Sequence, residues 1–203
     1  MKSHFSMIRQ FHLADALTLA NAFCGTGAIF AAMRYLQDGR VADLMWGMAL
    51  VPLAFVFDAL DGRVARWRHT SSVLGRELDS LSDVISFGVA PAALAYACGM
   101  QGGWDWLGLS YFVGCGVSRL ARYNVTAELL SGDSGKVRYF EGTPIPTSVV
   151  LVGVLALAAW QGRIGDGLWF GTTRFGWQLH PLVLMFALSG SLMISRTLRI
   201  PKP

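Results

Sequence analysis

The chain has 203 residues, of which 53% are hydrophobic and only 15% charged, and its mean hydropathy is +0.44. Soluble domains carry about one quarter charged residues, so this composition excludes an ordinary soluble protein and predicts an integral membrane protein with a single domain over residues 1–203. The net charge is +4, but the basic residues cluster at the ends of apolar segments. Membrane lipids and phosphate groups are therefore the expected partners, and nucleic acid is not.

Six apolar segments predict an all-α fold with six transmembrane helices. They are Leu13–Met33, Leu44–Leu60, Val84–Met100, Trp106–Val117 with a polar continuation to Asn124, Ile145–Trp160 and Leu179–Ile194. Several are shorter than the roughly 20 residues that a clean span needs, and charged residues occupy the missing turns. This pattern predicts helices that line a polar, water-reachable cavity at one end.

The N-terminal stretch "MKSHFSMIRQFHLAD" places Lys2 and Arg9 before an apolar segment, as a signal peptide does. The apolar segment is too long for a signal sequence and has no clear cleavage site, so it predicts a retained span. The preceding "MIRQF" predicts a short interfacial helix.

Three cysteines, Cys24, Cys98 and Cys115, lie inside apolar segments without CxxC spacing. They are expected to be small buried thiols and not disulfide or zinc ligands.

The basic residues indicate the orientation in the membrane. Of the 17 Lys and Arg residues, all but four lie at the two termini or in the second and fourth connections; the exceptions are Arg34, Arg40, Arg163 and Arg174. The positive-inside rule then places both termini and these connections on the cytoplasmic side of an inner or equivalent membrane. The polar cavity is expected on the same side, and Thr126–Pro146 is expected to be the one sizeable loop.

The stretch "DALDGRVARWRHTSSVLGRELDSLSD" joins the second and third helices and carries four carboxylates. Asp58 and Asp61 are three residues apart, and Asp79 and Asp83 four apart, so each pair shares one helix face. The short connection predicts an antiparallel hairpin in which the two pairs face each other. Four such charges repel at a membrane boundary unless they bind one or two divalent cations, and oxygen ligands favour Mg²⁺ or Mn²⁺.

Neighbouring residues suit a phosphate-bearing substrate, which commonly completes the coordination of Mg²⁺. Arg66 can contact a phosphate oxygen, while Gly62, Ala65 and Gly75 leave room for a bulky nucleotide or a facing backbone. Taken singly, each has a plainer explanation: an acidic helix cap, a basic membrane flank or a helix-packing glycine.

Together these residues form the pattern D-x2-D-G-x2-A-R-x8-G-x3-D-x3-D. Eight fixed positions at about one chance in twenty each give a random probability on the order of 10⁻¹⁰ per starting position. The pattern resembles the signature of the CDP-alcohol phosphotransferases. That resemblance implies six transmembrane helices, a homodimer, two metal ions at the cytoplasmic side, and release of CMP from a CDP-linked donor.

Two further stretches resemble those members of the family that use serine as the acceptor: "LADALTLANAFCG" near the N-terminus and "RYFEGTPIPTS" before the fifth helix. Thr18 and Asn21 match and are secondary candidates for binding CDP-diacylglycerol, with polar helix packing as the alternative. Ala14 and Asp15 depart from the Pro-Asn of many relatives.

The acceptor pocket has its own candidates. Arg119 and Arg122 lie on one helix face of "SRLARYN" and can bind the serine carboxylate, or serve only as positive-inside anchors. Residues 141–146 predict a rigid turn into the fifth helix. Within it, Glu141 is the candidate partner for the serine ammonium group, and Thr143 is a further candidate contact.

The resemblance implies transfer of a phosphatidyl group from CDP-diacylglycerol to the hydroxyl of L-serine. Asp58, Asp61 and Asp79 would be mainly metal ligands, and Asp83 a ligand and the general base. Three alternatives remain: a sister enzyme using glycerol 3-phosphate or inositol (phosphate), a non-catalytic relative that binds CDP-lipid, and an ion transporter that uses the aspartates as a relay.

Overall fold

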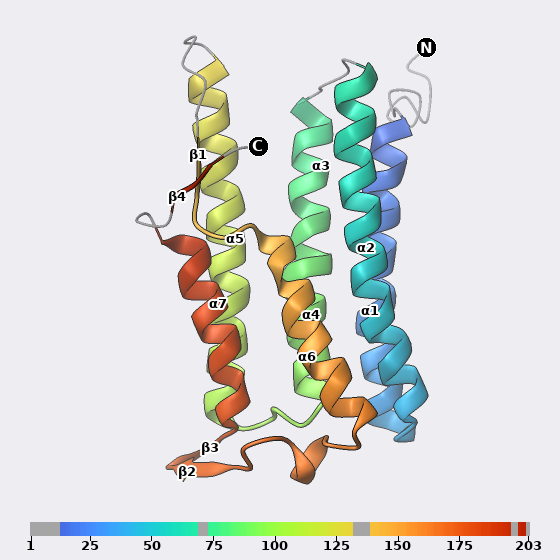
Figure 1. The fold of residues 1–203 in the computed structure, drawn as a ribbon, viewed down its shortest axis with the longest axis vertical. Coiled ribbons are helices and arrows are strands. Elements are labelled where there is room, and N and C mark those ends of the chain that lie inside the picture. Colours follow the sequence, from blue (N-terminus) through green and yellow to red (C-terminus); the bar gives the residue numbers. More distant parts are fainter. Residues whose placement is uncertain (1–12, 69–72, 132–138, 196–198, 202–203) are drawn as a thin grey trace, which may run out of the picture.

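The computed structural model describes residues 13–68, 73–131, 139–195 and 199–201. Figure 1 shows an elongated bundle whose long helices run side by side. The α-helices are α1 (Leu13–Asp38), α2 (Val41–Arg68), α3 (Val73–Asp83), α4 (Ala90–Ala97), α5 (Gly103–Ser131), α6 (Ser148–Trp160) and α7 (Leu184–Ile194). The predicted all-α class is confirmed, whereas the predicted interfacial helix lies outside the described residues.

Short helical turns join some of these helices into longer rods. The π-helical turn η2 (Val84–Val89) connects α3 directly to α4, and the 3-10 turns η3 (Ile145–Thr147) and η5 (Pro181–Val183) lead into α6 and α7. Another 3-10 turn, η4 (Gly165–Gly167), follows α6. Each of the six predicted apolar segments overlaps one of these rods, but the bounds differ.

Three helical stretches are long and apolar enough to cross a membrane: Leu13–Asp38, Val41–Val64 and Leu74–Ala97. Two more, Ile145–Trp160 and Pro181–Ile194, are apolar but shorter. Large apolar side chains such as Phe23, Trp46 and Trp160 are exposed on the outside of the bundle. A helical membrane protein is the architecture that accounts for both features.

The helices extend further than the apolar segments indicated. Helix α2 continues past Leu60 to Arg68, and α5 runs to Ser131, so the expected loop over Thr126–Pro146 is wrong at its beginning. The apolar pattern ends where the side chains become polar, but Ala, Arg, Leu and Glu still favour a helical backbone. Polar helical extensions therefore carry the site residues beyond the apolar spans.

Two short antiparallel strand pairs lie in the connections and were not anticipated. Strand β1 (Tyr139–Glu141) pairs with β4 (Arg199–Pro201), with Tyr139 opposite Pro201. Strand β2 (Thr173–Phe175) pairs with β3 (Trp177–Leu179) around Gly176, whose positive φ of 73° suits the tight turn. In Figure 1 the second pair lies at the end of the bundle where α6 leads toward α7.

Small side chains allow close packing between the N-terminal helices. Ala28 and Ala32 of α1 are buried, as are Leu44, Met48 and Val51 of α2. Figure 1 shows α1 and α2 side by side as an antiparallel pair. Gly39 follows the last residue of α1 and terminates the helix. Its φ is 66°, and its N–H donates to the Tyr35 carbonyl at 2.8 Å.

The three cysteines, Cys24, Cys98 and Cys115, are all buried and free, which confirms the expectation for them.

Candidate active site

The antiparallel arrangement of α2 and α3 brings three of the four predicted carboxylates together. One oxygen from each of Asp58, Asp61 and Asp79 lies within 4.8 Å of the others. Ligand oxygens on a single Mg²⁺ or Ca²⁺ ion, each about 2.0–2.6 Å from it, are spaced on this scale. The hairpin predicted from the sequence spacing is therefore confirmed for these three residues.

A buried oxygen without a partner shows that the cluster suits a cation. Oδ1 of Asp79 is buried and has no hydrogen-bond partner among the described residues. Leaving a buried acceptor unpaired costs free energy, more so for a charged group. A divalent cation held by Asp58, Asp61 and Asp79 would remove this cost and reduce the repulsion among the three, so the residues present fit a metal ion.

Asp83 lies one helical turn beyond Asp79 and is buried, with 7% of its surface exposed. It is not part of the three-residue group, although its charge interacts with those of Asp58 and Asp79. The side-chain nitrogen Nδ2 of Asn21 donates a hydrogen bond to Asp83 Oδ1 at 3.2 Å. Asp83 is thus held on the α1 side of the cluster.

Helix α1 forms a polar wall behind the carboxylates. Thr18 Oγ1 lies 2.7 Å from Asp61 Oδ2 and 3.0 Å from the Ala14 carbonyl, so its single proton can serve either acceptor. Both Thr18 and Asn21 are buried. The two residues proposed from the resemblance therefore contact the aspartates directly.

The π-helical turn after Asp83 docks closely against α1. Ser86 in this turn donates its hydroxyl to the Asn21 carbonyl at 2.8 Å. Gly25 permits the approach, because a Cβ there would lie 2.7 Å from Ser86 Cα and 2.9 Å from Ser86 N. Asn21 is thereby fixed through its backbone while its side chain reaches Asp83. A π-turn beside a site is a recurrent functional feature of helices.

The remaining signature residues surround α2. Arg66 is exposed, and its guanidinium lies over Gly62, where an added Cβ would sit 3.5 Å from Arg66 Nη1. This is an ordinary contact distance, so the described residues alone do not require glycine at position 62. Gly75 is half-buried on α3, whereas the side chain of Ala65 lies outside what the structure describes.

On α5, Arg119 is buried, with 9% exposed, and its charge interacts with that of Asp83. Its Nε has no hydrogen-bond partner in the described part of the chain, which leaves a donor near the carboxylates. Arg122 is half-buried on the same helix. Of the two predicted acceptor-binding arginines, the structure brings Arg119 to the site.

The turn predicted over residues 141–146 is confirmed only in part, because Glu141 ends strand β1 and the 3-10 turn η3 begins at Ile145. Gly142 has a φ of 73°, and a Cβ there would run into the Met193 carbonyl oxygen at the end of α7. Thr143 donates its N–H to the Leu192 carbonyl at 3.2 Å, while its buried Oγ1 has no partner among the described residues. The side chain of Glu141 lies outside the described part of the structure.

Sequence reasoning missed a polar link between α3 and α5. Asn124 Nδ2 donates to Ser80 Oγ at 3.0 Å and to Glu77 Oε2 at 3.3 Å. Glu77 and Ser80 lie next to the carboxylates in sequence, but their partner is more than 40 residues away. The link depends on α3 and α5 lying side by side, which no sequence spacing indicates.

Asp15 is a second omission. It is buried on α1, and its charge interacts with that of Asp61. The sequence marked this residue only as a departure from its relatives, so its place beside the cluster is new.

A helical membrane protein with a polar carboxylate cluster between α2 and α3 is the class that fold and site define. Residues 11–190 match the sequence profile of the CDP-alcohol phosphatidyltransferases, and the chain belongs to this family. Members of the family are generally dependent on divalent metal ions, which agrees with the carboxylate cluster.

Individual relatives narrow the similarity. A CDP-diacylglycerol–serine O-phosphatidyltransferase of Saccharomyces cerevisiae is 47% identical over 204 residues, covering 98% of this chain and 74% of that protein. An enzyme of the same name from Mycobacterium bovis is 34% identical and covers 77% of this chain and 52% of its own length. An archaetidylserine synthase of Methanothermobacter thermautotrophicus is 35% identical, covering 75% and 60% respectively. The chain thus spans about half to three quarters of these relatives.

Proposed function

We propose that this protein transfers the phosphatidyl group of CDP-diacylglycerol to the hydroxyl of L-serine, forming phosphatidylserine and releasing CMP. The observation that carries the proposal is the cluster of Asp58, Asp61 and Asp79, whose oxygens lie within 4.8 Å in a member of this family. The names of the relatives support serine as the acceptor. Serine appears in the names of the yeast and mycobacterial enzymes and of the archaeal synthase. The lipid group in the name differs, since the archaeal protein is named for archaetidylserine.

The same cluster supports a site for the diphosphate of the donor. In this proposal Arg66 contacts a phosphate oxygen, and Gly62, Ala65 and Gly75 leave space for the nucleotide. Thr18 and Asn21 shape the site from α1 through their hydrogen bonds to Asp61 and Asp83.

Two divalent cations, Mg²⁺ or Mn²⁺, are the proposed cofactors, held by Asp58, Asp61, Asp79 and Asp83. Bound ions of this kind neutralise phosphate charge and stabilise the attacking and leaving oxygens of a displacement. The unpaired Oδ1 of Asp79 supports this assignment.

Asp83 is proposed as the general base. It accepts the proton of the serine hydroxyl while the serine oxygen forms its bond to the lipid-linked phosphorus and the bond from that phosphorus to CMP breaks. The hydrogen bond from Asn21 is made to Oδ1 of Asp83, and Oδ2 is the proposed proton acceptor.

The serine itself is proposed to lie between α5 and the turn before α6. Arg119 is a buried guanidinium with an unused donor, which supports its binding the serine carboxylate. Arg122, Glu141 and Thr143 complete the proposed pocket, with Glu141 opposite the ammonium group.

The wider architecture follows from the same proposal. Residues 1–203 form one domain whose six helical rods span the membrane, with both termini, the polar cavity and the active site on the cytoplasmic side. The basic residues of the termini and of the second and fourth connections support this orientation. Two copies are proposed to form a homodimer.

The experiment is acceptor-dependent CMP release. Purified protein is incubated with CDP-diacylglycerol and Mg²⁺ or Mn²⁺, and with serine, glycerol 3-phosphate, inositol or inositol phosphate in separate reactions. CMP release in the reaction with serine, and in none of the others, supports the proposal. CMP release with a different acceptor assigns the protein to another CDP-alcohol phosphotransferase activity. If no acceptor gave CMP release, the proposed enzymatic activity would be refuted. A CDP-lipid-binding protein or an ion transporter would then be the remaining interpretations.

The base assignment has its own variant. Asp83→Asn keeps an oxygen to accept the hydrogen bond from Asn21 but cannot take a proton, so turnover should be lost while CDP-diacylglycerol still binds. Asp38→Asn, an exposed change at the far end of α1, is the matched control. Near-normal turnover in Asp83→Asn would contradict the assignment.

A further inference from the structure

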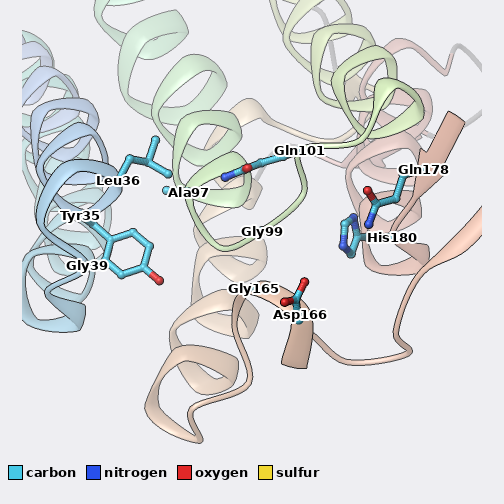
Figure 2. A pocket seen from close by; sticks show the side chains of 10 residues that line it. All are labelled: Tyr35, Leu36, Gly39, Ala97, Gly99, Gln101, Gly165, Asp166, Gln178 and His180. Carbon is cyan, nitrogen blue, oxygen red and sulfur yellow. The ribbon is translucent and has the colours of Figure 1, made fainter.

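The connection between α6 and α7, residues 161–180, contains η4, β2 and β3 and crosses the end of the bundle opposite the carboxylate cluster (Figure 1). Three of its polar residues, Asp166, Gln178 and His180, line a cavity of about 370 Å³. The other lining residues come from the ends of α1 and α4 and the connections that follow them, and from Gly165 (Figure 2). These polar groups therefore lie on the side of the connection that faces the bundle.

Hydrogen bonds attach this connection firmly to the bundle. Asp105 of α5 is completely buried, accepts the backbone N–H of His180 at 2.8 Å and lies 2.6 Å from His180 Nδ1. At the other end, Gly165 donates its N–H to the Cys98 carbonyl at 2.7 Å. The pairing of β2 with β3 occupies further backbone groups, which a segment close to the hydrocarbon of a membrane requires. The connection is thus a docked layer with a defined outer side.

Large aromatic side chains are exposed at this end of the bundle. They come from the connection and from the adjoining ends of α5 and α6: Trp104, Trp106, Trp160, Phe170 and Trp177. The rings of Trp104 and Trp177 pack against each other with centroids 5.6 Å apart, which joins the hairpin to α5. Tryptophan is enriched where membrane proteins cross from hydrocarbon to water. The exposed aromatic residues therefore indicate a membrane–water interface at this end.

Phe170 occupies an unusual position within the connection. It lies in a turn closed by the N–H of Gly171, which donates to the Leu168 carbonyl at 3.1 Å. Its φ is 69°, and among the residues that the structure describes no other non-glycine residue has a positive φ. Turns usually place glycine or asparagine at such a position. Leu168 is buried, whereas 77% of Phe170 is exposed, so this turn presents a large apolar ring to the surroundings of the protein.

The arginines of this end fall into two pairs. The four arginines outside the basic termini and the second and fourth connections are Arg34, Arg40, Arg163 and Arg174. Arg34 and Arg40 lie 3.8 Å and 3.7 Å from the carboxylate of Asp43. Arg163 and Arg174 are exposed on the α6–α7 connection, and neither forms an ion pair within the described part of the chain. The connection carries one carboxylate against these two guanidinium groups, so its charge favours an anionic partner.

We propose that the α6–α7 connection lies in the headgroup layer of the membrane and binds anionic phospholipid there. Phe170 and Trp177 reach the upper part of the acyl chains, and Arg163 and Arg174 bind lipid phosphate. The apolar exterior of α6 and α7 continues into this layer, which supports lipid as the occupant. Guanidinium groups match the geometry of phosphate, and anionic lipids attract basic residues near the membrane surface. This surface is separate from the carboxylate cluster and does not depend on the proposed transferase reaction.

The test places a fluorophore on the connection. The full chain carries Phe170→Cys labelled with bimane, and the buried native cysteines Cys24, Cys98 and Cys115 are changed to alanine. The protein is reconstituted into vesicles that contain phosphatidylcholine and phosphatidylglycerol in a fixed ratio, with bromine on the acyl chains of one lipid or of the other. Brominated chains quench only fluorophores close to them. The quenching therefore reports which lipid contacts position 170.

Two reference labels define the extremes of the quenching scale. Phe23→Cys lies on the exposed apolar side of α1, and Asp38→Cys lies at the exposed polar end of the same helix. We expect the label at position 170 to be quenched nearly as strongly as the label at position 23. Quenching no stronger than that at position 38 would overturn the membrane location. Protection from both lipids, with energy transfer between labels on two copies, would assign this face to contact between copies and would also overturn the proposal.

Two double variants test the role of the arginines. At position 170, brominated phosphatidylglycerol should be preferred over brominated phosphatidylcholine by at least about fivefold, the contribution of one basic residue near an anionic surface. Arg163→Gln with Arg174→Gln should reduce this preference to about one. Arg34→Gln with Arg40→Gln is the matched control and should retain the preference, because these side chains lie against Asp43. No preference in the parent, or equal loss in both double variants, would overturn the assignment of the arginines.

Discussion

Gly25→Ala tests whether the contact between α1 and the π-helical turn holds Asp83 in place. The new Cβ would lie 2.7 Å from Ser86 Cα and 2.9 Å from Ser86 N. Ordinary carbon contacts are about 3.5–4.0 Å, so the two backbones must separate by roughly 1 Å. Both hydrogen bonds at this crossing, from Ser86 to the Asn21 carbonyl and from Asn21 to Asp83, would lengthen with that shift.

The magnitude follows from two opposing terms. Overpacking costs about 1–3 kcal/mol, and a clash against backbone atoms belongs at the upper end. Alanine recovers about 1 kcal/mol through its higher helix propensity. The net loss is about 2 kcal/mol, which lowers the midpoint of thermal unfolding by about 4–8 °C for a chain of this size.

The effect on turnover is expected to be larger. A displacement of about 1 Å at a catalytic group can reduce the rate about 100-fold. Thermal unfolding in detergent measures the first effect, and CMP release from CDP-diacylglycerol and serine measures the second. Gly114→Ala on α5 is the control, because no atom lies within 4 Å of the added Cβ. If Gly25→Ala unfolds and turns over like the parent, the crossing does not position Asp83.

Three further predictions concern the same site. Thr18→Val removes the hydroxyl that lies 2.7 Å from Asp61. A hydrogen bond to a charged group contributes about 1.5–3 kcal/mol, so kcat/KM for CDP-diacylglycerol should fall about tenfold or more in initial-rate measurements. An unchanged kcat/KM would show that this bond is dispensable. Asn124→Leu removes the hydrogen bonds between α3 and α5 and should lower the midpoint of thermal unfolding. Asn124→Asp should lower this midpoint further, because it places a carboxylate against that of Glu77. A higher midpoint for Asn124→Asp than for Asn124→Leu would contradict the electrostatic reasoning. Removal of divalent ions with a chelator should abolish CMP release, and added Mg²⁺ or Mn²⁺ should restore it. The Asp79→Asn variant should need a higher concentration of either ion for half-maximal CMP release. Full activity in the presence of the chelator would refute metal dependence.

The sequence could predict the carboxylate cluster because its geometry is local. Asp58 and Asp61 share a helix face by spacing, as do Asp79 and Asp83, and a short connection forces their helices into antiparallel contact. Three of the four then meet in the structure. No long-range pairing had to be guessed, which is why this part of the site could be inferred from the sequence.

The contacts from other helices could not be predicted in this way. Asn124 reaches Glu77 across 47 residues, and His180 reaches Asp105 across 75. Neither pair has a spacing that marks it, since the contact depends on which rods become neighbours in the bundle. The π-helical turn could not be predicted either, because "VISFGV" has the composition of an ordinary apolar helix segment.

The apolar pattern also underestimated the helices at their polar ends. Hydrophobicity reports where a helix meets lipid or core, whereas hydrogen bonding and propensity decide where the helix stops. Arg66 and Asn124 both lie where apolar character fades but the helix continues. Residues that bind a charged substrate must lie in such regions, so site residues are found where span prediction is weakest.

Helix α1 shows how an apolar span can serve a polar site. Polar side chains in a membrane helix are costly unless they are paired, yet Asp15, Thr18 and Asn21 are all buried on this helix. Thr18 and Asn21 are paired with carboxylates of the neighbouring helices, so the same hydrogen bonds that make them tolerable also orient the aspartates. Oδ1 of Asn21 nevertheless has no partner in the described part of the chain. The Asp79 carboxylate also has a buried oxygen, Oδ1, without a partner among the described residues. Two buried acceptors without donors indicate that the site needs a positively charged or hydrogen-donating ligand.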